Sequence, residues 1–336
     1  MLWGVVSIVF LLFNVLPSDP ARLTLGQRSD LSSLENVRRE LNLDKPLWQQ
    51  YTLYLNDLSP IGWHRNEALE QYRGATIVSG KEHSLLVKEP FLRRSYQTKK
   101  PVWDVLMEAL PGTFILALAA IVIACIMGII LGVIAAVKQN TWLDTSAIMA
   151  SVAGISMPSF FAGVVIAYVF GFVLSDLTGL QMTGSLFDVD PEHGRQLQLK
   201  NLILPAITLG IRPLAIITQI TRTTMLDVLQ QDFIRTAYAK GLSRTRILFK
   251  HALRNALNPI ITTVSGWFAE LLAGSFFIET IFGWKGLGKV TVDALDRFDF
   301  PVVMGAILFT GFLFIITNML VDVLYAIVDP RIRLAD

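Results

Sequence analysis

The sequence predicts an all-α integral membrane protein with six transmembrane helices and a large extracytoplasmic loop after the first helix. Three observations predict this fold class. Of the 336 residues, 53% are hydrophobic and only 17% are charged, and the charged residues are concentrated in a few segments. Several apolar runs reach the roughly 20 residues that a helix needs to cross a hydrocarbon core about 30 Å thick. One loop between two such runs is strongly basic.

Five of the apolar runs are long enough to span a bilayer, and each is nearly free of charge. They are Leu110–Val137, Thr145–Leu174, Leu202–Thr221, Pro259–Phe282 and Val302–Val328. A sixth run, Leu2–Leu16, has only 15 residues, and it lacks the basic start and the cleavage site of a signal peptide. We therefore expect a first transmembrane helix over residues 1–17, with its true start upstream.

Residues 18–107 form the predicted extracytoplasmic cap. Within it, Leu31–Leu58 has the apolar spacing of a helix, interrupted at Pro46. Residues 61–90 are polar and contain several glycines, so we expect an insertion that is flexible or that packs separately.

Residues 108–330 form the predicted five-helix core, and the charges of its loops give the orientation because cytoplasmic loops retain Lys and Arg. The loop 222–257 holds seven Lys or Arg against two acidic residues, whereas 176–200 carries four acidic and two basic residues. We therefore place the first loop in the cytoplasm and the second outside. The tail 331–336 adds two arginines, so both termini are predicted to be cytoplasmic.

The basic loop itself has a helix-glycine-helix pattern. Its first half begins at Asp232 and ends at Lys240, charges that favour the helix dipole, and Gly241 follows as a left-handed stop. The second half has an apolar face and a separate basic stripe, formed respectively by Phe249, Ala252, Leu253 and Ala256 and by Arg246, Lys250 and Arg254. Two amphipathic helices are therefore expected to meet at a glycine corner.

Several functional classes are disfavoured by the same residues. Cys125 is the single cysteine, so an intramolecular disulfide is impossible, and the four histidines lack the spacing of a metal site. No Ser-His-Asp or Cys-His constellation can be assembled, so we predict no catalytic or metal-binding residue. A net charge of +2, with the basic excess in one membrane-flanked loop, makes nucleic acid an unexpected partner. The two halves show no repeat symmetry, which disfavours an ion-coupled secondary carrier.

The basic loop carries a family resemblance. The run RTAYAKGLS at 235–243, followed by HALRN at 251–255, resembles the cytoplasmic "EAA" loop of binding-protein-dependent ABC importer permeases of the dipeptide, oligopeptide and nickel branch. Further stretches agree with this family in order along the chain: LPSDPA at 16–21, ELNLDKPL at 40–47, RSY at 94–96, ETIF at 279–282, GLG at 286–288 and DFP at 299–301. Lys285 departs from the pattern, because a proline commonly precedes the Gly-Leu-Gly turn.

The resemblance implies a type I importer permease with a MetI-like fold, multi-pass in the bacterial plasma (inner) membrane. It implies three kinds of partner besides membrane lipid: a second homologous permease subunit, two ABC ATPase subunits and an extracytoplasmic solute-binding protein. The chain has no GxxxxGK[ST] phosphate loop, so we expect no cofactor in it, with ATP and Mg bound by the ATPase subunits. The residues expected to couple to the ATPase are Arg235, Thr236, Ala237, Tyr238, Ala239, Lys240, Gly241 and Leu242.

Among these residues, we expect the contact with the ATPase to be made by Tyr238, Ala239, Lys240, Gly241 and Leu242, with Gly241 providing the corner. The alternative is a basic loop that only fixes the topology. The expected cargo is a di- or oligopeptide, with a nickel complex or another small solute as the alternative. An ion-coupled secondary carrier is the more distant alternative, and a membrane-bound hydrolase would need a catalytic constellation that the sequence lacks.

Polar residues inside the apolar runs are candidates for the translocation path, because burying them in lipid is costly. Glu270 lies near mid-depth of its run, where it would face a cavity and attract a cationic group or hydrogen-bond to a neighbouring helix. Arg212 ranks second. Ser156 and Ser159 flank Pro158, and they would either line a polar path or mark a kink.

Overall fold

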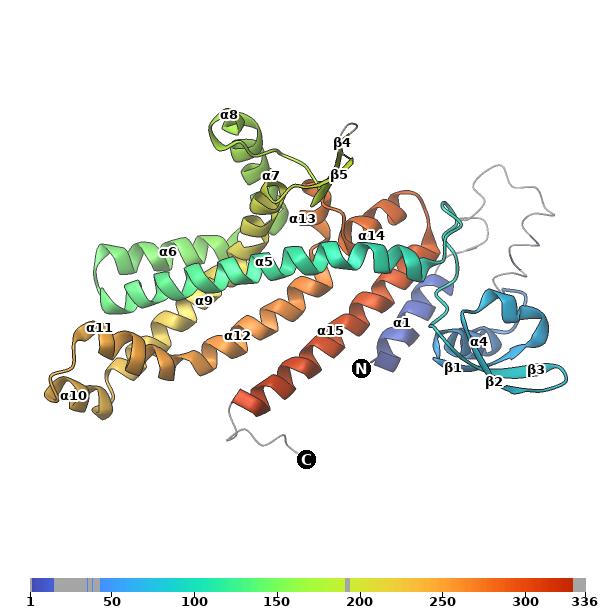
Figure 1. Cartoon of the computed structure of the whole chain (residues 1–336), viewed down its shortest axis with the longest axis horizontal. Coiled ribbons are helices and arrows are strands. Elements are labelled where there is room, and N and C mark those ends of the chain that lie inside the picture. Colours follow the sequence, from blue (N-terminus) through green and yellow to red (C-terminus); the bar gives the residue numbers. More distant parts are fainter. Residues whose placement is uncertain (1, 15–34, 36–37, 39–42, 191–193, 329–336) are drawn as a thin grey trace. The chain divides into compact units, whose positions relative to one another are not determined.

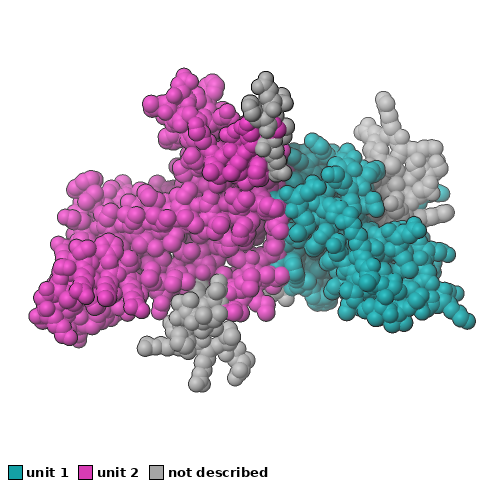
Figure 2. All heavy atoms as spheres, viewed as in Figure 1, with its two compact units in different colours: residues 1–109, 290–312 teal, residues 110–289, 313–336 magenta. Residues whose placement is uncertain are grey.

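The computed structural model describes residues 2–14, 35, 38, 43–190 and 194–328, which divide into two compact units (Figure 1). Unit 1 comprises residues 1–109 and 290–312, and unit 2 comprises residues 110–289 and 313–336 (Figure 2). The predicted tail 331–336 and most of the predicted helical stretch before Pro46 lie outside the described residues.

Unit 1 is held together by aromatic and aliphatic packing around two short helices. Helix α1 (Leu2–Asn14) and helix α4 (Leu47–Leu58) meet through Phe10 and Tyr54, whose ring centroids are 5.5 Å apart. Val6 belongs to the same buried cluster, and Met304 and Leu308 of helix α15 (Phe300–Val328) pack against it. This packing joins the first apolar helix to the beginning of the last one.

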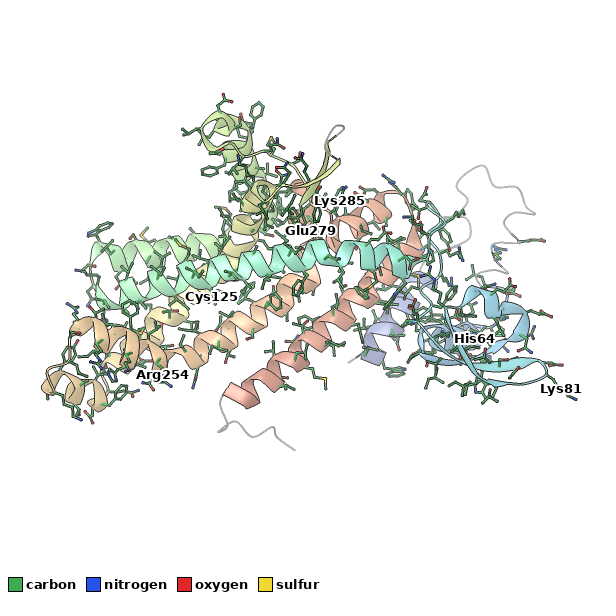
Figure 3. The ribbon with its side chains drawn as sticks, viewed as in Figure 1. His64, Lys81, Cys125, Arg254, Glu279 and Lys285 are labelled. Atoms are coloured by element: carbon green, nitrogen blue, oxygen red, sulfur yellow. The ribbon has the colours of Figure 1, made fainter. Side chains whose placement is uncertain are left out.

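The predicted insertion 61–90 is a small antiparallel sheet. Strand β3 (His83–Lys88) lies between β1 (Ile61–Arg65) and β2 (Gly74–Ser79), and the 3-10 helix η1 (Asn66–Gln71) connects β1 to β2. The amide of Asn56 in α4 donates to the Trp63 carbonyl at 2.8 Å and accepts its N–H at 3.1 Å, so α4 occupies the free edge of β1. Lys81 lies at the tip of the β2–β3 hairpin (Figure 3), and His64 is buried. The insertion is therefore an ordered part of unit 1.

Unit 2 is built mainly of long helices. Its helices are α5 (Val102–Val137, which begins in unit 1), α6 (Trp142–Ser156), α7 (Ser159–Tyr168), the π-helix η2 (Val169–Val173), α8 (Ser175–Thr178), α9 (Lys200–Leu229), α10 (Asp232–Ala239), α11 (Arg244–Arg246), the π-helix η3 (Ile247–Ala252), α12 (Leu253–Gly274) and α13 (Phe276–Ile281). Helix α14 (Leu287–Asp296) crosses from unit 2 into unit 1. A two-stranded ribbon, β4 (Phe187–Asp190) with β5 (Gly194–Leu197), precedes α9.

Three described helices are long and apolar enough to cross a membrane, namely α5, α9 and the part of α15 from Phe300 to Val323. The predicted span Thr145–Leu174 is broken into α6 and α7–η2, which are bent by 107°. Pro158 explains the break, because it lacks a backbone N–H and holds Met157 in extended geometry (ψ 126°). The predicted span Pro259–Phe282 is likewise divided, between α12 and α13. A count of six spans stays a prediction.

Helices α5 and α9 approach closely because α5 presents glycine at the contact. A Cβ placed on Gly128 would lie 2.8 Å from Cγ2 of Ile217, and one on Gly132 would lie 2.5 Å from Cβ of Thr221. The small-xxx-small spacing of the two glycines therefore brings the helices together. Helix α12 adds Ile260, Leu271 and Leu272 to the buried cluster between them.

Candidate functional site

The glycine corner predicted in the basic loop is present. Helix α10 ends at Ala239, and Gly241 follows with φ +72° in the left-handed region. The Gly241 N–H donates to the Tyr238 carbonyl at 2.9 Å, and the Leu242 N–H donates to the Ala237 carbonyl at 3.3 Å. This pair of bonds is the Schellman helix end, which favours glycine at the left-handed position.

The predicted coupling residues divide into an inward and an outward set. Ala237 is buried and Leu242 is partly buried, and both join a cluster that also contains Ile234, which the sequence did not single out. The remaining residues are exposed: Arg235, Thr236, Tyr238, Ala239, Lys240 and Gly241. Tyr238 has half of its surface exposed. The inward set therefore fixes α10 to unit 2, and the outward set is available to a partner.

The buried cluster beneath α10 joins the ends of three long helices. Val133 and Ala136 come from α5, Met225 and Val228 from α9, and Ala256 from α12. Ile234 and Ala237 belong to the same cluster, so α10 shares one buried core with the ends of all three helices.

The second half of the loop is helical, as predicted, but its apolar face is not the predicted one. Ala252 and Ala256 are buried, whereas Phe249 is 60% exposed. The reason is the π-helix η3, whose wider turn rotates Phe249 away from the face of the alanines. The basic stripe is exposed, as its pattern predicts, and Arg254 projects from it (Figure 3).

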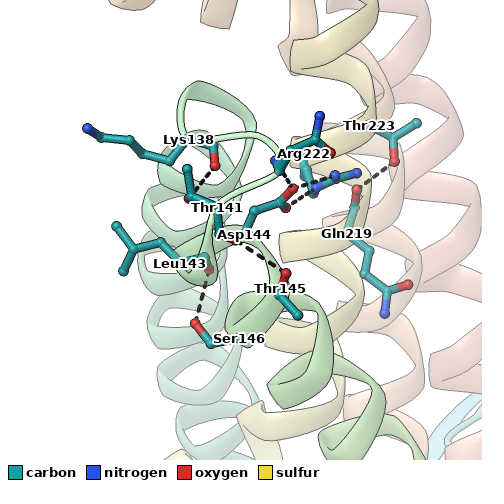
Figure 4. A network of polar contacts seen from close by, with 10 residues as sticks. Lys138, Thr141, Leu143, Asp144, Thr145, Ser146, Gln219, Arg222 and Thr223 are labelled. Carbon is teal, nitrogen blue, oxygen red and sulfur yellow. Dashed lines mark hydrogen bonds and ion pairs between the residues drawn. The ribbon is translucent and has the colours of Figure 1, made fainter.

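An ion pair that the sequence did not reveal joins α6 to α9 near this loop. Nε of Arg222 donates to Oδ1 of Asp144 at 2.5 Å, and Nη2 donates to Oδ2 at 2.8 Å (Figure 4). The backbone N–H of Asn140, a residue with φ +61°, also donates to Oδ2 at 3.0 Å. Asp144 thus fixes both the turn before α6 and the last part of α9.

The four candidates for the translocation path lie at or near the surface of the chain. Arg212, Glu270 and Ser156 are exposed, and Ser159 is half-buried. The Arg212 guanidinium lies 6.0 Å from the ring centroid of Trp267, one helical turn before Glu270 in α12. Arg212 and Glu270 therefore belong to neighbouring faces of the packed helices α9 and α12. Their role in a path stays a prediction.

A second carboxylate of the same apolar run, Glu279, is fully buried. Its Oε1 accepts hydrogen bonds from Thr113 Oγ1 at 2.7 Å and from Ser275 Oγ at 2.5 Å. Its other oxygen, Oε2, accepts the Lys289 N–H at 3.0 Å, and the Gly288 N–H also donates to the carboxylate. Glu279 therefore ties α13 both to α5 and to the first turn of α14.

The turn between α13 and α14 wraps tightly around this carboxylate. A Cβ on Gly286 would lie 2.5 Å from the Glu279 carboxyl carbon, and one on Gly112 would lie 1.8 Å from the Lys285 carbonyl oxygen. The Trp284 Nε1–H donates to the Gly112 carbonyl at 2.9 Å. Lys285, beside Glu279 in Figure 3, has an exposed side chain. The glycines of this turn are thus required by close backbone approach.

Within the described part of the chain, no group of three or more His, Cys, Asp or Glu could hold a metal ion. His64 is buried in unit 1, where its ring lies 3.9 Å from that of Tyr72, centroid to centroid. Burial, together with the charge of Lys88, lowers the pKa of His64 to about 4. His193 lies outside the described residues.

Comparison with known proteins relates the chain to one family over nearly its whole length. Residues 128–334 match the family of binding-protein-dependent transport system inner membrane components, and residues 1–117 match the N-terminal part of such components. The described fold resembles a chain of the inward-facing MetNI methionine ABC transporter, with a TM-score of 0.54 and 15% identity over 68% of this chain and 97% of that one.

Three named relatives align along almost the full chain. The di/tripeptide transport system permease protein DppB of Pseudomonas aeruginosa (strain UCBPP-PA14) is 36% identical, over 98% of this chain and 94% of its own. The dipeptide transport system permease protein DppB of Escherichia coli (strain K12) is 35% identical over the same shares. The glutathione transport system permease protein GsiC of Escherichia coli (strain K12) is 35% identical, over 97% and 92%.

Proposed function

The chain belongs to the family of binding-protein-dependent transport system inner membrane components, and on this premise we propose that it is the permease subunit of an ATP-driven importer of di- or oligopeptides. The names of its relatives support this cargo, because dipeptides, tripeptides and glutathione are all short peptides. ATP hydrolysis belongs to separate ATPase subunits, and an external solute-binding protein delivers the peptide.

The observation that carries this proposal is the division of the coupling segment into anchored and exposed residues. Ile234 and Ala237 are buried against the ends of the long helices, while Tyr238 and Phe249 expose large aromatic surfaces beside a basic stripe. Exposed aromatic residues are characteristic of protein interfaces, and a rigidly anchored helix transmits force better than a mobile loop. An ATPase subunit seated on this surface would move the helix ends when it closes.

The second homologous permease subunit is supported by the exposed charges of Arg212 and Glu270. Arg212 lies in α9, which is long and apolar enough to cross a membrane, and Glu270 lies in the predicted span Pro259–Phe282. A charge in contact with lipid is costly in such segments. A water-filled path shared with a second subunit removes that cost. On this proposal Glu270 and Arg212 face the path, with Ser156 and Ser159 further along it, and both chain termini are cytoplasmic.

The decisive experiment reconstitutes the chain with its partner subunits and its solute-binding protein in proteoliposomes. The assay measures ATP-dependent uptake of a labelled dipeptide, with a nickel complex as the competing cargo. Tyr238→Ala should reduce both uptake and binding-protein-stimulated ATP hydrolysis at least tenfold. The matched control is Phe172→Ala, another exposed aromatic residue of unit 2, which should leave both unchanged. Uptake that persists without ATPase subunits would instead establish a secondary carrier.

The path residues have their own test. Glu270→Gln should reduce uptake of peptides with a free amino terminus more than uptake of amino-terminally acetylated peptides, because the carboxylate attracts the cationic group. Equal uptake of both peptide classes by the variant and the unmodified protein would remove Glu270 from the path.

A further inference from the structure

Unit 1 contains a cavity that the transport proposal does not use. Its volume is about 110 Å³, enough for a phosphate-sized group with accompanying water, and it lies where the loop after β3 enters α5. Charged groups of both signs line it: Arg73, Arg93 and Arg94 with Glu70 and Glu89. Trp103, in the first turn of α5, completes the wall.

The three arginines of the cavity differ in how their donors are used. Arg73 is held by Asp104 in a bidentate ion pair at 2.6 and 2.8 Å. Arg94 makes one long hydrogen bond, 3.5 Å, to the Lys99 carbonyl. Among the described residues, no side-chain hydrogen bond or ion pair holds the half-buried Arg93. Arg93 and most of Arg94 are therefore available to a ligand, since each guanidinium carries five N–H donors.

The backbone that carries Arg93 is fixed without any ligand. Arg93 has φ +65°, a conformation that costs a non-glycine residue about 1–3 kcal/mol and persists only where its surroundings impose it. Its carbonyl accepts the Val102 N–H at 3.0 Å, and two residues earlier the Phe91 N–H donates to the Asp57 carbonyl at 2.9 Å. The Phe91 ring packs edge to face on Tyr72. The guanidinium thus starts from a preorganised position.

The cavity lies beside the first turns of a membrane-spanning helix. A Cβ placed on Gly305 of α15 would lie 2.5 Å from Cγ1 of Val102 and 3.6 Å from Cβ of Leu92, which lines the cavity. The Trp103 ring packs edge to face on Phe309 of the same helix, at 5.7 Å. Tryptophan is enriched at the membrane–water boundary, and the headgroup layers add about 5–7 Å on each side of the hydrocarbon core. A membrane crossed by α5 over its apolar residues would therefore place the charged wall at headgroup depth.

We propose that this cavity binds the headgroup of a zwitterionic phospholipid, with the phosphate on Arg93 and Arg94 and the ammonium group beside Glu70 and Glu89. Guanidinium groups bind phosphate oxygens in a bidentate fashion, which suits the two arginines with unused donors. The carboxylates disfavour a purely anionic ligand, because they would repel it in the same small space. A phosphoethanolamine lipid has the required pair of charges.

Native mass spectrometry of the full chain tests this proposal. The protein, with its partner subunits, is reconstituted in phosphatidylethanolamine or in phosphatidylglycerol and then extracted in mild detergent. The unmodified protein should retain one phosphatidylethanolamine molecule that Arg93→Ala and Arg94→Gln lose. The fraction of each variant that carries this molecule should be at least fivefold lower than that of the unmodified protein. Arg94→Gln remains decisive if Arg93→Ala does not fold. Arg65→Ala removes an exposed arginine outside the cavity and should retain the lipid.

Three results would overturn the proposal. Equal retention by the unmodified protein and the two cavity variants would show that the arginines hold no lipid. Equal retention of phosphatidylglycerol and phosphatidylethanolamine would show that the ammonium group is not recognised. Displacement of the lipid by dialanine, but not by glycerophosphoethanolamine, would assign the cavity to peptide. Displacement by glycerophosphoethanolamine alone supports recognition of the headgroup.

Discussion

Replacing Glu279 by alanine tests whether this carboxylate holds the first turn of α14. The Gly288 and Lys289 N–H groups belong to that turn, so they have no acceptor within their own helix. The hydroxyls of Thr113 and Ser275 can rotate to other acceptors, but the two backbone donors cannot. Leaving one buried donor without a partner costs about 1–3 kcal/mol. For the two backbone N–H groups together, a conservative loss in the free energy of opening the turn is therefore about 3 kcal/mol. This loss corresponds to a roughly hundredfold change in an opening equilibrium.

Hydrogen exchange followed by mass spectrometry measures this opening in the peptide 283–296. In Glu279→Ala, exchange at the start of α14 should accelerate roughly a hundredfold. In Glu279→Gln the acceleration should be about five- to tenfold, because the amide oxygen can still accept the two N–H groups while its NH₂ faces the two hydroxyls. The matched control is Glu108→Gln, whose side chain is exposed and only 3.7 Å from Lys100, and which should not change exchange.

Two results would refute this reasoning. Unchanged exchange in Glu279→Ala would mean that other acceptors hold the turn. Exchange in Glu279→Gln as fast as in Glu279→Ala would mean that the negative charge, and not the acceptor geometry, is what the turn requires.

Three further predictions follow from local geometry. Gly241→Ala should destabilise the end of α10 by about 1–2 kcal/mol, because φ is +72° there. It should also lower the number of peptides transported per ATP hydrolysed, and an unchanged ratio of peptide to ATP would contradict a coupling role. Asp144→Asn should cost about 2–3 kcal/mol by leaving the partly buried Arg222 without its anion, and a double-mutant cycle with Arg222→Gln should show a coupling energy above 1 kcal/mol. The pKa of His64 in the folded cap lies below its unfolded value of about 6.5, so the unfolded chain binds more protons between pH 6.5 and 4. The free energy of opening the cap, measured by proteolysis, should therefore fall by about 2 kcal/mol as the pH falls through this window. In His64→Gln this pH dependence should disappear.

The features that the sequence predicted are those determined by neighbouring residues. The corner at Gly241 depends only on a helix of suitable length followed by a residue that adopts positive φ, and both are readable in ten residues. The break at Pro158 was indicated as a possible kink for the same local reason, although its size of 107° was not. The length and low charge of the apolar runs likewise located α5, α9 and α15.

The choice between the two carboxylates of the run 259–282 shows what such patterns lack. Hydropathy treats Glu270 and Glu279 alike, and depth alone favoured Glu270, yet Glu279 is the buried one. The missing information was the set of donors: a hydroxyl from α5, another at Ser275, and backbone N–H groups from a turn that only glycine permits. Ser275, four residues before Glu279, and the Gly-Leu-Gly run were both visible in the sequence close to the carboxylate. Thr113 could not be connected with it, because it is 166 residues away.

Long-range pairing also hid the ion pair of Asp144 with Arg222, which are 78 residues apart. Arg222 was counted only as part of a basic loop. The sequence likewise did not indicate the sheet of the insertion 61–90, which was expected to be flexible or to pack separately. Its strands β1 and β2 meet only by pairing with β3, and β2 is exposed along its whole length. A short polar strand carries little periodic signal until its partner is known.

The packing beneath α10 constrains how the proposed coupling segment can act. If Gly241 were a free hinge, a partner that moved α10 would bend the corner and leave the long helices in place. Ile234 and Ala237, however, are buried in one cluster with residues of α5, α9 and α12, so α10 cannot move without displacing these side chains. Packed interiors transmit such displacements because they lack room to absorb them. On the proposed coupling role, Gly241 sets the direction of the chain and the buried cluster transmits the motion.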